Sequence, residues 1–237
     1  MADQKVSYTL DGKVAVLRID DGKANAVSAE LMDELLAALE RAEREARAVL
    51  MIGRQGRFSA GFDLTVMMAS PDSARDLVKT GAHFLMSLYL HPLPVVVACT
   101  GHALAAGALM LLTADVRIAA EGPFKIGLNE VAIGMRLPVF AIELARERLS
   151  RRHFVAATTF GRVYSPAEAA DVGFVDRVVA AERCVEDALA TARKLAELPS
   201  GALAETKHLS RQSMVDFVLD TLDEDLATIG PPTPAAS

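Results

Sequence analysis

Two glycine-rich turns are the residues of this chain best suited to stabilising charge in a reaction. The first is Phe58-Ser59-Ala60-Gly61-Phe62-Asp63-Leu64, and the second is Gly101-His102-Ala103-Leu104-Ala105-Ala106-Gly107. Each turn follows an apolar run typical of a buried strand, and its small residues let backbone N–H groups approach a ligand closely. Two such turns side by side could aim two N–H donors at one oxygen, which is how enzymes stabilise an oxyanion or an enolate. The turns therefore favour a catalytic function.

A third segment that could carry chemistry runs from Ile126 to Gly134 and contains a single glutamate, Glu130. The neighbours of Glu130 are mostly apolar, and in such surroundings a carboxylate is costly to bury and its pKa tends to rise. A raised pKa suits a general base or acid that works near neutral pH. A structural role for Glu130, as a helix cap or an ion-pair partner, is the alternative.

Other classes of site fit the sequence less well. Neither turn has the G-x-G-x-x-G spacing of a dinucleotide site, and Ser59 lies outside the G-x-S-x-G frame of a serine hydrolase. His, Cys, Asp and Glu residues do not occur at metal-ligand spacing, so we expect no metal site.

The composition indicates a large core and no general affinity for nucleic acid. Hydrophobic residues make up 51% of the 237 positions and the net charge is −6, which disfavours binding to a polyanion. Cys99 and Cys184 lack disulfide or metal spacing and are expected to be buried free thiols. The N-terminus lacks a secretory pattern, and no apolar run reaches the roughly 18 residues of a membrane span. We therefore expect a cytoplasmic protein that binds neither nucleic acid nor membranes.

Strand and helix patterns alternate along the first part of the chain. Residues 6–10 and 14–19 predict a β-hairpin across Asp11-Gly12, and Ser28 is expected to cap the helix that follows. Further strands are predicted over 48–52, 95–99 and 116–119, with helices over 73–90 and 105–113 between them. This order predicts an α/β architecture.

Beyond Pro138 the pattern is mostly helical. Helices are predicted over 140–149 and 151–159, a capping box at Ser165–Glu168 begins another that ends near Gly173, and 175–179 is a candidate short strand. We divide the chain into a core (residues 1–195), a C-terminal helical region (196–230) that packs on the core or on a neighbouring subunit, and a proline-rich, disordered tail (231–237).

The two turns and the glutamate segment together resemble the crotonase superfamily of acyl-CoA enzymes, the enoyl-CoA hydratase and isomerase family, from about Val6 to Val179. The resemblance implies a crotonase (ClpP/crotonase-like) fold of repeated strand-strand-helix units with a helical C-terminal region, assembled as a homotrimer or hexamer. It also implies an acyl-CoA thioester as substrate, with no cofactor beyond that coenzyme A, and a place in fatty acid β-oxidation.

The resemblance further assigns roles to individual residues. The backbone N–H groups of Phe62 and Ala106 match the two donors of the family's oxyanion hole, and Glu130 matches a catalytic glutamate. Thr65 stands where many relatives place a lysine that contacts coenzyme A, and Ala105-Ala106 replaces the more usual Gly-Gly. The residues expected to contact the acyl-CoA are Lys23, Ala24, Asn25, Ala60, Gly61, Phe62, Asp63, Leu64, Ala106 and Leu109.

Leu109 narrows the expected reaction. Typical hydratases of the family carry a second glutamate at this position, and a leucine can neither bind nor activate water. The mitochondrial type of Δ3,Δ2-enoyl-CoA isomerase is similar in its Ile-Gly-Leu-Asn-Glu segment and in its apolar residue at the position of Leu109. The resemblance therefore favours isomerisation with Glu130 as the single acid and base. The alternatives are a lyase that hydrates 2-enoyl-CoA, another enolate reaction, and non-catalytic binding of acyl-CoA.

Overall fold

A six-stranded sheet in the order β1-β2-β4-β7-β9-β11 forms the centre of the structure, a computed structural model that describes residues 4–230. β1 and β2 form the predicted antiparallel hairpin, and the remaining neighbours pair in parallel. The predicted disordered tail, residues 231–237, lies outside the described residues. The strands are β1 (Val6–Asp11), β2 (Val14–Ile19), β4 (Ala48–Ile52), β7 (Val95–Cys99), β9 (Val116–Ala120) and β11 (Arg177–Val179).

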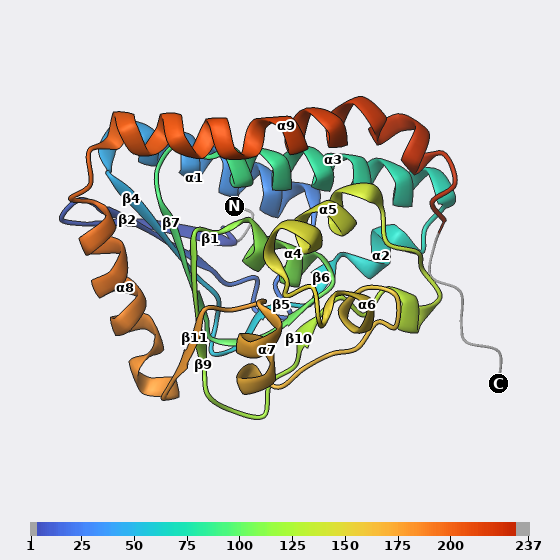
Figure 1. The fold of residues 1–237 in the computed structure, drawn as a ribbon, viewed down its shortest axis with the longest axis horizontal. Coiled ribbons are helices and arrows are strands. Elements are labelled where there is room, and N and C mark those ends of the chain that lie inside the picture. Colours follow the sequence, from blue (N-terminus) through green and yellow to red (C-terminus); the bar gives the residue numbers. More distant parts are fainter. Residues whose placement is uncertain (1–3, 231–237) are drawn as a thin grey trace.

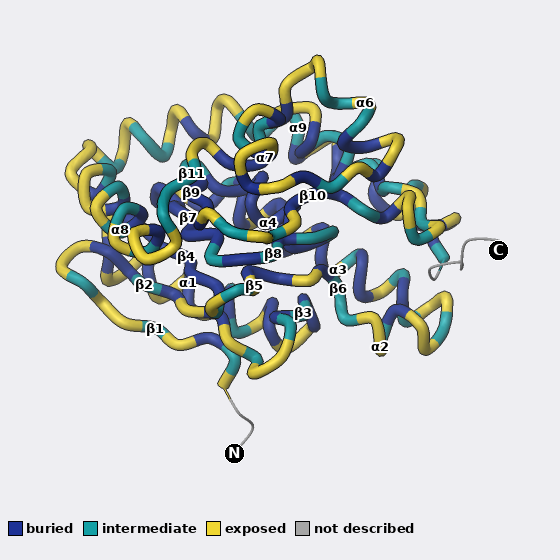
Figure 2. The backbone as a smooth tube through the Cα atoms, turned by 90° about the horizontal axis from the view of Figure 1, so that it is seen from below, coloured by how far each residue is buried: buried dark blue, intermediate teal, exposed yellow. Residues whose placement is uncertain are grey.

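Helices cover both faces of this sheet (Figure 1). α8 (Cys184–Leu195) packs on one face, and α1 (Ala29–Glu45) and α3 (Pro71–Leu90) lie on the other. In β4, Leu50 belongs to the apolar cluster under α8 and Met51 to the larger cluster under α1 and α3. Strands buried on both faces read as continuous apolar runs, which is why they were visible in the sequence. Figure 2 shows the buried strands beneath helices whose outer faces are exposed.

Three central strands each continue into a shorter strand of a second, parallel sheet with the order β10-β8-β5. β5 (Gly56–Ser59) follows β4, β8 (Gly101–Leu104) follows β7, and β10 (Ile126–Gly127) follows β9. A third sheet pairs β3 (Ala26–Val27) with β6 (Gly61–Phe62). None of these segments was predicted as a strand, because strands of two to four residues are too short to show a periodicity.

Local capping chemistry fixes where several helices begin. The Ser28 side chain accepts a hydrogen bond from the backbone N–H of Leu31 at the start of α1, as predicted. α7 (Pro166–Val172) begins with the predicted capping box and ends at Gly173. α3 begins at Pro71, capped by Ser70, two residues before the predicted start.

The helix predicted over 151–159 is wrong in extent. The chain turns at residues 151–153, and only α6 (Phe154–Ala157) is helical. The β-branched Thr158 and Thr159 follow α6, and the Thr158 hydroxyl donates to the Phe154 carbonyl oxygen, which competes with continuation of the helix. The other helices near the site are α2 (Leu64–Met67), α4 (Ala106–Thr113) and α5 (Val139–Arg148).

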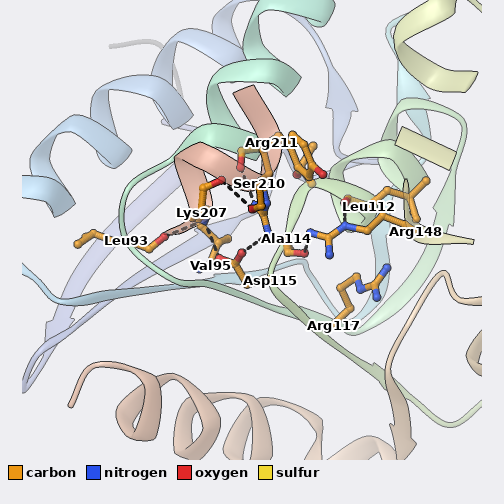
Figure 3. Close-up of polar contacts among 12 residues, drawn as sticks. Leu93, Val95, Leu112, Ala114, Asp115, Arg117, Arg148, Lys207, Ser210 and Arg211 are labelled. Atoms are coloured by element: carbon orange, nitrogen blue, oxygen red, sulfur yellow. Dashed lines mark hydrogen bonds and ion pairs between the residues drawn. The ribbon is translucent and has the colours of Figure 1, made fainter. Parts of the chain in front are cut away.

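The C-terminal helix α9 (Ser200–Leu226) packs on the core of its own chain, where it lies along α3 and against α5 (Figure 1). Its first half is anchored to Asp115, which accepts hydrogen bonds from Lys207 at 2.7 Å and Arg211 at 2.6 Å (Figure 3). Lys207 also donates to the Leu93 carbonyl oxygen and Arg211 to that of Tyr89. None of the helices within residues 4–230 combines the length and the apolar composition that crossing a bilayer requires.

Candidate active site

The topology brings the three predicted catalytic residues to one edge of the second sheet. β5, β8 and β10 are neighbours, and they end two or three residues before Phe62, Ala106 and Glu130, respectively. Because the carboxyl ends of parallel strands meet at the same edge of a sheet, the residues that follow these strands lie in one region. The turns and the glutamate segment, far apart in sequence, thus form a single candidate site.

The two glycine-rich turns touch each other at Gly61. A Cβ atom built on Gly61 would lie 2.8 Å from the Cβ of Ala105 and 3.4 Å from the backbone nitrogen of Ala106. Gly61 also has a φ of +99°, which L side chains rarely adopt. Only glycine therefore lets the first turn approach the second this closely, and the approach brings the peptide before Phe62 next to the N–H of Ala106.

Phe62 is held from two sides. Its backbone belongs to β6, which pairs in parallel with β3 of the early loop. Its half-buried ring packs on α3 where Gly81 presents bare backbone, since a Cβ there would lie 2.3 Å from the ring carbon Cζ. Strand pairing and ring packing together fix the direction of the Phe62 peptide.

Ala106 is the first residue of α4, so its N–H has no acceptor within the helix and lies at the positive end of the helix dipole. The preceding Ala105 has a φ of +49° and a ψ of −125°, an uncommon conformation for a residue with a side chain. The N–H of Ala105 donates to the Gly127 carbonyl oxygen at 3.0 Å, which links the second turn to the strand before Glu130. The uncommon backbone angles of Ala105 turn the chain from β8 into α4, so the Ala106 peptide lies where the strands of the second sheet end.

Glu130 is a buried carboxyl group, 8% exposed, whose Oε2 has no hydrogen-bond partner among residues 4–230. Burial raises the pKa of Glu130 to about 7, and a backbone hydrogen bond opposes the rise. Its side chain does not cap the short 3₁₀ helix that follows, and no ion pair to it occurs in the described part of the chain. The structure thus shows Glu130 neither as a side-chain cap nor as an ion-pair partner, and its raised pKa lies in the range that suits proton exchange near neutral pH.

Leu109 is buried on α4, three residues after Ala106 and on the same face of the helix. An apolar side chain therefore lies beside the turn at the position where a second carboxylate would be needed to handle water. Within residues 4–230, no three His, Cys, Asp or Glu side chains gather closely enough to hold a metal ion.

The early loop and the first turn, both predicted to contact acyl-CoA, lie side by side. The N–H of Ala60 donates to the carbonyl oxygen of Ala24 at 3.0 Å. The Asn25 side chain is fully buried and donates to the carbonyl oxygens of Ile19 and Phe58. Asn25 thus joins the loop to the first turn.

The remaining predicted contact residues differ in exposure. The Asp63 side chain accepts from the Thr65 N–H and so caps α2. Leu64 is 61% exposed, and Lys23 is exposed while its carbonyl oxygen accepts a hydrogen bond from Arg54. Lys23 and Leu64 are therefore free to contact a ligand that lies along the first turn.

Arg57 and Lys125 place two positive charges near His102 on the second sheet. Arg57 on β5 lies opposite His102 on β8, and Nδ1 of His102 accepts from the backbone N–H of Lys125. Partial burial and the nearby charges of Arg57 and Lys125 lower the pKa of His102. Lys125 was missed, although its position immediately before a short apolar strand was a usable signal.

Comparisons with known proteins show the family and the fold that the chain shares. The family model described as enoyl-CoA hydratase/isomerase matches residues 9–226. The human protein named enoyl-CoA delta isomerase 1, mitochondrial, is 33% identical over 218 residues, which cover 90% of this chain and 72% of that protein. Among solved structures, an enoyl-CoA hydratase/isomerase family protein from Pseudomonas syringae has a TM-score of 0.92 and 40% identity, covering 95% of this chain and 98% of the other. An enoyl-CoA hydratase from Mycobacterium marinum has a TM-score of 0.89 and 34% identity, covering 95% and 100%.

Proposed function

Because the chain belongs to the enoyl-CoA hydratase/isomerase family, we propose that it moves the double bond of a 3-enoyl-CoA to the 2-position, with Glu130 as the single acid and base. The predicted crotonase fold is confirmed by the solved structures that the chain resembles. The protein is an enzyme that acts on acyl-CoA thioesters, as an isomerase or a hydratase. The choice of isomerisation rests on the site itself.

The buried, unpartnered carboxyl group of Glu130 carries the proposal. In its ionised form Glu130 takes the proton from C2 of the 3-enoyl thioester, the electrons of that C–H bond form a C1–C2 double bond, and the carbonyl electrons move onto the thioester oxygen. When the proton returns to C4, the electrons of the C3–C4 double bond form the new C–H bond, those of C1–C2 form the C2–C3 double bond, and the carbonyl is restored. One carboxyl group suffices because the proton that leaves C2 is the proton that C4 receives, and a pKa of about 7 suits both transfers.

The dienolate formed between the two transfers needs donors for its thioester oxygen. The N–H groups of Phe62 and Ala106 are proposed as these donors, supported by the contact between the two turns and by the place of Ala106 at the start of α4. The apolar Leu109 helps exclude the water that hydration would consume. We propose that no cofactor is required beyond the coenzyme A of the substrate.

The coenzyme A portion is proposed to lie along the early loop and the first turn, from Lys23 to Asn25 and from Ala60 to Leu64. Their side-by-side arrangement and the exposure of Lys23 support this position. Because Thr65 supplies no charge, the phosphates need other cations, and the exposed Arg57 and Lys125 of the second sheet are the candidates that the structure offers.

Hydration of a 2-enoyl-CoA is the second candidate function, and one observation favours it. Oδ1 of Asn129, next to Glu130, is buried without a hydrogen-bond partner among the described residues. Such an acceptor could hold the water that a hydratase activates, although it supplies no second acid or base.

A substitution that removes only the acid-base function tests the proposal. Glu130→Gln should lower kcat for isomerisation of a 3-enoyl-CoA by at least about 10²- to 10⁴-fold while the Kd for a saturated acyl-CoA stays unchanged. The matched control is Glu121→Gln, an exposed glutamate outside the site. The measurement is the rise in absorbance of the conjugated 2-enoyl thioester, with binding followed by calorimetry.

Three results would contradict the proposal in different ways. Undiminished turnover by Glu130→Gln would remove Glu130 from the reaction. Faster loss of conjugated absorbance from crotonyl-CoA than isomerisation of the 3-enoyl substrate would favour hydration. Binding of acyl-CoA without turnover of either substrate would indicate a non-catalytic protein.

A further inference from the structure

The segment that follows Glu130 is held only in part by packing. Residues 131–137, called the Glu130 loop below, are all half-buried or exposed. Met135 and Leu137 pack against the main apolar cluster, and an open surface pocket of about 460 Å³, lined in part by Val131, Met135, Leu137, Ile142 and Thr158, lies beside the loop. Hydrogen bonds therefore supply much of what holds the loop in one place.

At its near end the loop is tied to the backbone of Glu130. The N–H groups of Ile133 and Met135 both donate to the Glu130 carbonyl oxygen, at 3.0 and 2.9 Å. Gly134, with a φ of +77°, turns the chain between them. Glu130 and Met135 therefore move together, and a displacement of the loop is passed to the residue that bears the base.

At its far end the loop is tied to α9 through Asp225. One carboxylate oxygen of Asp225 accepts from Arg136 Nη1 at 2.8 Å, and the other accepts from the Val139 N–H at 2.7 Å. Arg136 donates in addition to the Thr228 hydroxyl, at 3.0 Å, and to the Asp225 carbonyl oxygen. Val139 is the first residue of α5 and Pro138 offers no side-chain cap, so Asp225 caps this helix from a distant part of the chain.

The Asp225 side chain is only 8% exposed, whereas Arg136 is 41% exposed. A carboxylate that is this well buried and accepts from both a guanidinium and a helix N-terminus forms a stronger and more rigid contact than a surface ion pair. This contact is the point at which the Glu130 loop meets the C-terminal helix.

We propose that Asp225 and Arg136 are positioning residues that orient the carboxyl group of Glu130 through the loop. The proposal rests on the proposed role of Glu130 as the acid and base. Oε2 of Glu130 has no partner of its own within residues 4–230, so the direction of the side chain depends on the backbone that carries it. That backbone is fixed to Met135 on one side, and the loop is fixed to Asp225 on the other.

The test compares two aspartates on the same stretch of α9. Asp225→Ala removes the contact with the loop, whereas the control Asp223→Ala removes an ion pair between α9 and Lys79 of α3. We expect Asp225→Ala to lower kcat for isomerisation about tenfold with KM nearly unchanged, as for a displaced catalytic group, and Asp223→Ala to change neither. Asp225→Asn, which keeps an acceptor for Val139, should restore part of kcat.

A second measurement reports on the loop without catalysis. Hydrogen exchange of residues 131–138, followed by mass spectrometry, should accelerate in Asp225→Ala and remain at the wild-type rate in Asp223→Ala. If Asp225→Ala does not fold, Arg136→Met, at a half-exposed position, takes its place with the same expectations.

Two outcomes overturn the positioning role. One is a kcat for Asp225→Ala that stays at the wild-type value, and the other is an equal fall in kcat for Asp225→Ala and Asp223→Ala. These outcomes differ from failure of the proposed function, in which the wild type itself does not isomerise a 3-enoyl-CoA or Glu130→Gln is fully active.

Discussion

Two buried carboxyl groups of this protein have opposite surroundings. Asp115 lies between Lys207 and Arg211, which together with hydrogen bonds hold its pKa below the usual value despite burial. Glu130 is buried without such cations, and burial raises its pKa to about 7. Ionising Glu130 in the folded protein therefore costs about 3 kcal/mol more than in water. A cost of this size supports the acid–base role proposed for Glu130.

The raised pKa of Glu130 sets the expected pH dependence of the enzyme. Only the ionised carboxylate can take the C2 proton, so kcat/KM should rise with pH below about 7 and level off above it. The measurement is kcat/KM for a 3-enoyl-CoA between pH 5.5 and 9, because the pH dependence of this ratio reports the pKa values of groups in the free enzyme. A profile that is flat across pH 6 to 8, or that falls with increasing pH, would contradict Glu130 as the base.

The elements around the site depend on one close approach, between β6 and the turn before α4. Gly61→Ala should shift the two turns apart, because the new methyl group would lie 2.8 Å from the Cβ of Ala105. Loss of one oxyanion donor typically lowers kcat by about 10²- to 10³-fold, and we expect a fall of that size in the isomerisation assay.

Gly12→Ala is the matched control for this variant. Gly12 also has a positive φ, +58°, but lies in the hairpin of β1 and β2 with nothing within 4 Å of an added Cβ. Gly12→Ala therefore places a side chain at an unfavourable positive φ, but its new methyl group collides with no other atom. Equal kcat values for the two variants would show that the turns do not need to touch.

The sequence predicted the long elements, together with the short α7 and β11, and missed the strands of the two smaller sheets. β4 and β7 were predicted with their observed ends, and Ser28 and Ser165 were identified as caps, because these features depend on local composition. The second sheet was missed, since its strands are defined by pairing between distant segments. The candidate site residues were found through the turns and the resemblance, whereas the strain at Ala105 and the contact of Asp225 with the loop depend on tertiary structure.

On the scale of the whole molecule, α9 contacts parts of the core that lie far apart in the sequence. Its first half holds Asp115, which follows α4, and its end holds Arg136 and the start of α5. The helix spans the molecule above α3 (Figure 1). The C-terminal helical region is thus part of the same packed body as the site.

Removal of the carboxylate that anchors α9 should destabilise the whole protein. Asp115→Ala leaves the buried Lys207 and the partly buried Arg211 without their counter-charge, so the free energy of unfolding should fall by about 3–5 kcal/mol. Because the pKa of Asp115 is lowered, the stabilisation is present at neutral pH and is lost as the pH falls below about 4. Urea denaturation of the wild type and of Asp115→Ala, at neutral pH and at acidic pH, measures the difference in the free energy of unfolding.

The control for this variant is Asp216→Ala, an exposed aspartate of α9 that pairs only locally with Gln212. Its effect should stay within about 0.5 kcal/mol. A similarly small effect of Asp115→Ala would mean that apolar packing alone keeps α9 in place.

The position of Asp225 near the end of α9 also has a consequence for the order of synthesis. Phe62, Ala106 and Glu130 all leave the ribosome before α9 does, so the second sheet can pair while the Glu130 loop still lacks its far anchor. A nascent chain at that stage contains all three of these residues, yet the Glu130 side chain is not yet held in its final orientation. On this view the full activity is reached only when the last long helix has docked.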